Sequence, residues 1–133
     1  MNIEKYTSLL LRLGISVVFL LFGIDKFIRP LFWAAFVPKF LNDIIPFSLT
    51  NFIYLMGLIE TILGALIFIG LFTRIASILS AIHLFFIIIS LAIPLGYNDI
   101  IVRDIGLFFM ALALSLFRIY PFSFDNIKKK LWK

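Results

Sequence analysis

The sequence predicts an all-α integral membrane protein, an antiparallel four-helix bundle with an interfacial or re-entrant segment after the first helix. Two observations carry this prediction. Of the 133 residues, 63% are hydrophobic and only 14% are charged, and the apolar residues gather in four stretches of near-spanning length. Soluble domains are usually about half apolar and a quarter charged, so a soluble enzyme and a disordered chain are both excluded. We expect residues 1–133 to form a single transmembrane domain.

Four spans are expected, because a helix crosses about 30 Å of hydrocarbon with about 20 residues. They lie at about residues 8–27, 50–71, 75–95 and 100–117. The second and third are the most apolar, since the second contains one charged residue, Glu60, and the third only the titratable His83. The first and fourth span only if the charged residues at their ends reach the membrane surfaces.

The connections between the spans differ in length. Residues 72–74 and 96–99 are short enough for hairpin turns, whereas the first connection covers about residues 28–49 and holds three prolines. Its middle, residues 31–37, is apolar but too short to cross a bilayer. We expect this part to lie at the outer leaflet, where the indole of Trp33 suits the membrane interface.

The basic residues predict the orientation, because they favour the cytoplasmic side. With both termini in the cytoplasm, eight basic residues lie inside and four outside. The basic tail at residues 125–133 is expected to rest on anionic headgroups, and the net charge of +5 does not indicate nucleic-acid binding. The predicted cytoplasmic anchors are Arg12, Arg74, Arg118, Lys128, Lys129 and Lys130.

The composition also limits the chemistry. The chain has no cysteine and one histidine. Without cysteine it cannot form a disulfide, carry an iron–sulfur cluster or build a thiolate zinc site, and one histidine cannot hold a bis-histidine haem. No set of acidic residues has metal-ligand spacing, so no metal site is predicted. A redox role would therefore require a bound organic cofactor such as a quinone, or a partner protein.

Glu60 and His83 form the first candidate site. At 100° per residue, Gly57, Glu60 and Gly64 share one face of the second span, and His83 lies on a small-residue face of the third. A tight hairpin joins these spans, so both side chains come to similar depths and a contact is plausible. Two interpretations stay open. The pair serves as a proton relay or a clamp for a quinone carbonyl, or it is a buried polar pair that fixes helix register.

A second candidate site combines the end of the first span with the start of the fourth. Asp25, Lys26, Arg103 and Asp104 should lie at one membrane level, where they could form Asp25–Arg103 and Lys26–Asp104 pairs. Together with Glu60 and His83 they form the candidate polar pocket. The cluster either lines a pocket that opens outward or is an ion-pair network that closes the bundle.

These segments resemble the DoxX/DoxD-like family. The resemblance rests on residues 12–14, 22–27, 60–64, 69–74 and 102–107, and its most specific part is the Gly-Leu-Phe-Thr-Arg hairpin at 70–74. It implies a small four-helix membrane protein in the plasma membrane of a bacterium or archaeon. Some relatives are membrane subunits of a thiosulfate:quinone oxidoreductase, some are linked to thiol stress, and distant ones act as cargo receptors or assembly chaperones.

Two functions follow as hypotheses. In the first, the chain is a membrane subunit that helps a partner pass electrons to quinone, in a system related to thiosulfate or thiol stress. In the second, it is a non-enzymatic scaffold, chaperone or small-molecule carrier. Both involve the lipid bilayer, with a protein partner or a second copy of the chain. Direct thiol chemistry is excluded by the missing cysteine.

Overall fold

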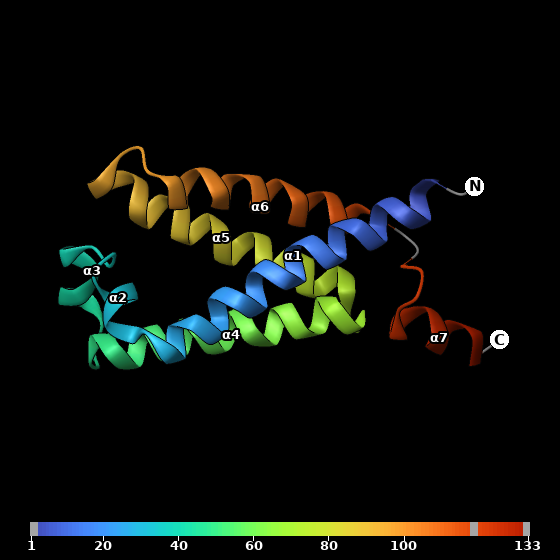
Figure 1. Ribbon diagram of the computed structural model, residues 1–133, viewed down its shortest axis with the longest axis horizontal. Coiled ribbons are helices and arrows are strands. Elements are labelled where there is room, and N and C mark those ends of the chain that lie inside the picture. The colour runs from blue at the N-terminus through green and yellow to red at the C-terminus, as the bar shows by residue number, and fades with distance from the viewer. Residues whose placement is uncertain (1–2, 118–119, 132–133) are drawn as a thin grey trace.

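The computed structural model describes residues 3–117 and 120–131, and within these ranges the protein is all-α, with no strand. Figure 1 shows the course of the chain. The helices are α1 (Ile3–Ile28), α2 (Pro30–Ala34), α3 (Lys39–Ile44), α4 (Leu49–Ile69), α5 (Thr73–Leu95), α6 (Asp99–Leu116) and α7 (Phe124–Leu131). The four predicted spans correspond to α1, α4, α5 and α6, and the long first connection contains the two short helices α2 and α3.

Three of these helices, α1, α4 and α5, are long and apolar enough to cross a membrane. Helix α6 has 18 residues and carries Asp99, Arg103 and Asp104 in its first turns, which explains its lower apolar content. Much of the outer surface is hydrocarbon, and side chains such as Leu21, Phe86 and Phe109 are each more than 60% exposed. Exposed apolar patches of this extent mark a surface that lipid or another protein covers.

The ends of the long helices have local causes. Ser48 caps α4 by accepting a hydrogen bond from the Asn51 backbone N–H at 3.3 Å, and Asn98 caps α6 by accepting one from Ile101 at 3.0 Å. Gly70 ends α4 with a φ of 72°, a left-handed conformation that glycine adopts without a Cβ penalty. Asp125, distant in sequence, accepts hydrogen bonds from the backbone N–H groups of Phe72 and Thr73 at 2.8 Å and thereby caps α5.

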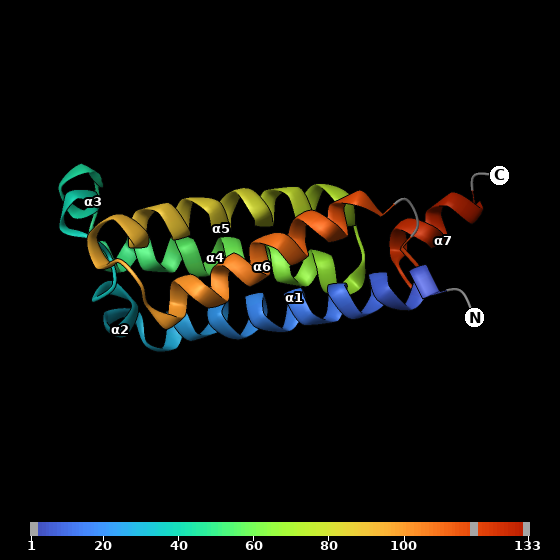
Figure 2. The same cartoon turned by 90° about the horizontal axis from the view of Figure 1, so that it is seen from above.

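The long helices lie side by side as two closely packed pairs, α1 with α4 and α5 with α6, as Figures 1 and 2 show. Gly23 and Gly57 allow the first pair to approach closely, since a Cβ on Gly57 would lie 2.8 Å from the Gly23 carbonyl oxygen. The predicted small-residue face of α4 therefore does contact a neighbouring helix, and that neighbour is α1. Close backbone approach at small residues is typical of helix pairs in membranes.

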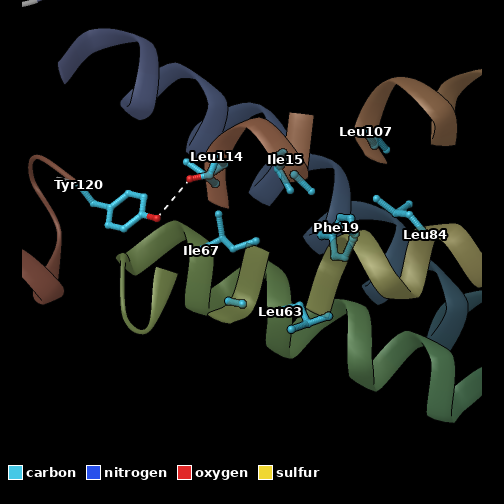
Figure 3. Packing of buried hydrophobic residues seen from close by; sticks show 11 residues of the cluster. Ile15, Phe19, Leu63, Ile67, Leu84, Leu107, Leu114 and Tyr120 are labelled. Atoms are coloured by element: carbon cyan, nitrogen blue, oxygen red, sulfur yellow. Dashed lines mark hydrogen bonds between the residues drawn. The ribbon is translucent and has the colours of Figure 1, made fainter. Parts of the chain in front are cut away.

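The core lies between the two pairs and extends toward the turn that joins α4 to α5. Ile15 and Phe19 of α1 meet Leu63 and Ile67 of α4, with Leu84, Leu107 and Leu114 completing the cluster (Figure 3). Tyr120 closes this end, where its hydroxyl donates a hydrogen bond to the Leu114 carbonyl oxygen at 3.2 Å. The opposite end, beside α2 and α3, contains a cavity.

Candidate functional site

A cavity of about 410 Å³ lies among α1, α4, α5 and α6, beneath the segment that carries α2 and α3. This volume falls within the range of about 300–1,000 Å³ that is typical of small-molecule sites. Apart from Ser90, the polar side chains that line it are Lys26, Glu60, His83, Arg103 and Asp104, and all other lining residues are apolar. Five of the six predicted pocket residues thus line one cavity, and Asp25 does not.

Glu60 is the centre of the polar cluster. Its Oε2 lies 2.6 Å from the Lys26 Nζ, and its Oε1 lies 3.1 Å from the His83 Nε2. Glu60 and Lys26 are buried, at 6% and 8% exposure. The expected contact between Glu60 and His83 is present, and Lys26, which was not predicted to contact Glu60, joins it. One carboxylate therefore connects three helices, α1, α4 and α5, at the wall of the cavity.

Arg103 and Asp104 form a second ion pair on α6. The Arg103 Nη2 lies 2.7 Å from the Asp104 Oδ1, and Asp104 is 2% exposed. The guanidinium carbon of Arg103 lies 4.0 Å from the centroid of the Phe22 ring, a cation–π contact between α6 and α1. Arg103 thus presents a cation, partly open to the surroundings, at the same cavity that Lys26 and Glu60 line.

The predicted pairs Asp25–Arg103 and Lys26–Asp104 are wrong. Asp25 instead forms a two-pronged ion pair with Arg29, one helical turn further along, at 2.7 and 2.8 Å. Lys26 is rotated by about 100° from Asp25 on the same helix, so it faces α4 and meets Glu60. Local geometry along α1 and the orientation of α1 against α4 decide these partners, rather than membrane level alone.

The roof of the cavity is formed by the segment between α1 and α4. Trp33 of α2 is 8% exposed, and its Nε1 donates a hydrogen bond to the Asp25 Oδ2 at 2.7 Å. Its ring lies 4.3 Å from the Lys26 Nζ. The spacing of Asp25, Arg29 and Trp33 at four-residue intervals is the sequence signal for this arrangement, whereas the apolar surroundings of Trp33 predict only an interface residue. Trp33 therefore covers Lys26 at the charged end of the cavity.

The comparison with protein families decides which family this is. A family model, DoxX, matches residues 7–93. The chain belongs to the DoxX family. The matched region runs from α1 into α5 and includes Lys26, Glu60 and His83, whereas Arg103 and Asp104 lie beyond it. No curated protein and no solved structure matches the chain.

The charges that line the cavity of this DoxX protein balance. Lys26 and Arg103 are cationic, Glu60 and Asp104 are anionic, and each cation lies within 2.7 Å of a carboxylate oxygen. With a neutral His83 the sum is zero. A buried site with balanced charge and apolar walls suits a ligand with a neutral polar head, because an unpaired charge in such a site is costly. In the described part of the chain, no three potential metal ligands lie together.

The predicted anchors of the DoxX protein have different positions. Arg74 is exposed at the turn between α4 and α5. Arg12 is not a surface anchor, since it is 2% exposed and its guanidinium donates to the carbonyl oxygens of Ile67 at 3.1 Å and Phe68 at 2.9 Å, near the end of α4. It also donates to Pro121 at 2.8 Å. Arg118 and the side chains of Lys128, Lys129 and Lys130 lie outside the described residues.

Proposed function

We propose that this DoxX protein is a membrane subunit of a quinone-linked oxidoreductase system, related to thiosulfate or thiol-stress metabolism. The observation that carries the proposal is the apolar cavity with the Lys26–Glu60–His83 cluster at its wall. A quinone has a neutral ring with two carbonyl oxygens, which accept hydrogen bonds, and an apolar body. The balanced charges and the apolar walls favour this head over the thiosulfate dianion.

The cluster also supplies groups for proton transfer. Reduction of a quinone to a quinol takes up two electrons and two protons. The electrons would come from a partner protein. The Lys26 ammonium is placed to donate a hydrogen bond to a carbonyl oxygen at the cavity, and the Glu60–His83 contact at 3.1 Å is short enough to pass a proton between the two groups. In this proposal the DoxX chain binds the quinone and supplies the protons, and the partner protein supplies the electrons.

The proposed topology places the site in the membrane. We propose that α6 is the fourth span of an antiparallel bundle, that α2 and α3 lie at the outer interface, and that both termini are cytoplasmic in a prokaryotic plasma membrane. Two observations support this arrangement. Helix α6 lies beside α5 over its length, and the beginnings of α1 and α7 lie at the same end of the molecule (Figure 1). The distribution of basic residues favours that end as cytoplasmic.

The test replaces the central carboxylate. Quinone reduction is measured in membranes that contain the Glu60→Gln protein and its partner, with protein levels matched to those of the unaltered chain. Loss of the carboxylate should lower the rate by about 10²-fold or more, the range that a positioned acid or base contributes. Glu4→Gln, at an exposed position in the first turn of α1, is the matched control and should leave the rate unchanged. An unchanged rate of quinone reduction in membranes with Glu60→Gln would refute the proposal.

A non-enzymatic carrier or scaffold is the second candidate. It is favoured by one specific observation, that the charged groups at the cavity already satisfy one another in two ion pairs. Such a site binds an amphiphile without reacting with it. Purification in a mild detergent distinguishes the two functions. A quinone or an electron-transfer protein that copurifies supports the first, whereas a client protein without redox activity supports the second.

A further inference from the structure

The cavity has two flanks of different character. On one flank, between α1 and α6, Phe22 and Arg103 lie in contact across the two helices. On the other flank, between α4 and α5, the lining residues nearer to α2 and α3 include Phe52 and Met56 of α4 and Ile87 and Ser90 of α5, and the Glu60–His83 contact lies deeper between the same two helices. The cations Lys26 and Arg103 thus belong to α1 and α6, and the part of the second flank beyond Glu60 and His83 presents hydrocarbon apart from Ser90.

The end of the cavity toward α2 is closed. Trp33 and Pro38, both buried, belong to the roof. Trp33 is held in place by its hydrogen bond to Asp25, which is itself fixed by two contacts with Arg29. A ligand from the aqueous side would have to break this network before it reached Lys26.

The flank between α4 and α5 leads to the outer surface instead. Figure 1 shows the two helices diverging from the turn that joins them toward the end where α2 and α3 lie. Phe86 of α5 lines the cavity and is nevertheless 64% exposed, so the cavity reaches the outer surface at this residue. In a membrane this outer surface faces lipid hydrocarbon.

We propose that the ligand enters sideways from the bilayer between α4 and α5. Its polar head points toward Lys26 and His83, and its hydrocarbon tail stays between Met56 and Ser90. The inference rests on the proposed function and narrows its substrate class to a membrane-dissolved quinone with an apolar tail. Contact of the tail with the apolar flank makes the free energy of binding more favourable, because hydrocarbon buried against hydrocarbon is removed from water and from the headgroups.

The test narrows the flank and compares two quinones. Ser90→Phe and Met56→Phe each place a larger side chain on one wall, and Ile89→Phe places the same ring on the adjacent exposed face of α5 as a control. The probes are a tailless dimethoxy-methyl-benzoquinone and the same ring with a decyl chain. Binding is read from quenching of Trp33 fluorescence in detergent. Because the chain has two tryptophans, all variants carry Trp132→Phe.

Both narrowed variants should bind the decyl quinone about tenfold more weakly, a change of about 1.4 kcal/mol. Binding of the tailless quinone, and of both probes to Ile89→Phe, should change little. Equal losses for the two probes, or no loss for either, would overturn the lateral route and leave the quinone function standing. If neither probe quenches Trp33 in the protein without the flank substitutions, the proposed function and the route are both overturned.

Discussion

The Lys26 Nζ lies 2.6 Å from the Glu60 Oε2, so an ion pair links α1 to α4 at a position where both residues are buried, at 8% and 6% exposure. A buried pair of this kind is not a simple source of stability, because both charges lose their solvation. Its clearest consequence is that each charge requires the other, because either charge buried alone at this position is strongly unfavourable. Glu60 also contacts His83, and the pair therefore links the packing of α1, α4 and α5 to the chemistry of the cavity.

Removing Lys26 alone should destabilise the fold more than removing both charges. Lys26→Met leaves Glu60 without its cation and should cost about 3–5 kcal/mol of unfolding free energy. The double variant Lys26→Met/Glu60→Gln should recover most of this loss. Unfolding in detergent micelles measures both. Arg29→Met, which breaks an ion pair with a 58% exposed side chain, is the control and should change the free energy of unfolding little, because solvent screens an exposed pair. Additive losses in the double variant would contradict the dependence of the two charges.

Gly23→Ala should separate α1 from α4. A Cβ at this position would lie 2.8 Å from the Thr61 backbone nitrogen and 2.9 Å from the Gly57 carbonyl oxygen, and neither atom can move without its helix. Overpacking of this kind costs about 1–3 kcal/mol. The matched control is Gly106→Ala in α6, where no side chain and no neighbouring helix lies within 4 Å of the new Cβ, and where the unfolding free energy should rise by about 0.5–1 kcal/mol. Thermal unfolding that ranks the two variants in the opposite order would refute the close contact.

The positions of the long helices could be predicted from the sequence, but several partners within the site could not. Apolar length marks α1, α4 and α5, and the 100° rotation per residue brings Glu60 toward His83. The partner of Lys26 depends on how α1 is rotated against α4, and contact at Gly23 and Gly57 decides that rotation. No periodicity in the sequence predicts this rotation of α1 against α4. Membrane depth alone pairs Asp25 with Arg103, whereas Arg29, one helical turn away on the same helix, is nearer and pairs with it.

The partners of Arg12 also could not be predicted from the sequence, because they are backbone carbonyl groups. Its position near one end of a span predicted a surface anchor, yet its bonds go to carbonyl groups near the end of α4 and after α6. Gly70, which ends α4 in the left-handed conformation, was the available signal. A helix that ends there leaves carbonyl oxygens without intrahelical partners, and a buried guanidinium supplies their donors.

Arg12→Lys should therefore destabilise the end of the molecule where α7 begins. A lysine nitrogen cannot reach the carbonyl oxygens of Ile67, Phe68 and Pro121 together, so at least one charge-assisted bond is lost, at about 1.5 kcal/mol. We expect faster proteolytic cleavage within residues 120–127 and lower thermal stability in detergent. Arg74→Lys, at an exposed position near the same end, should match the unaltered protein in both measurements. Equal cleavage rates for the two variants would rule out the role of Arg12 in holding this segment.

Asp25→Ala should loosen the roof of the cavity. The carboxylate accepts a hydrogen bond from the Trp33 Nε1 at 2.7 Å and pairs with Arg29, and both contacts disappear with it. Trp33 should then become more exposed to water, so its fluorescence in a Trp132→Phe background should shift to longer wavelength and be quenched more by acrylamide. Arg29→Gln removes the ion pair but keeps the carboxylate for Trp33, and it should shift the emission less. If Asp25→Ala leaves the emission maximum and the quenching unchanged, the hydrogen bond does not hold the roof, and the neighbouring Lys26 contact must be sufficient to do so.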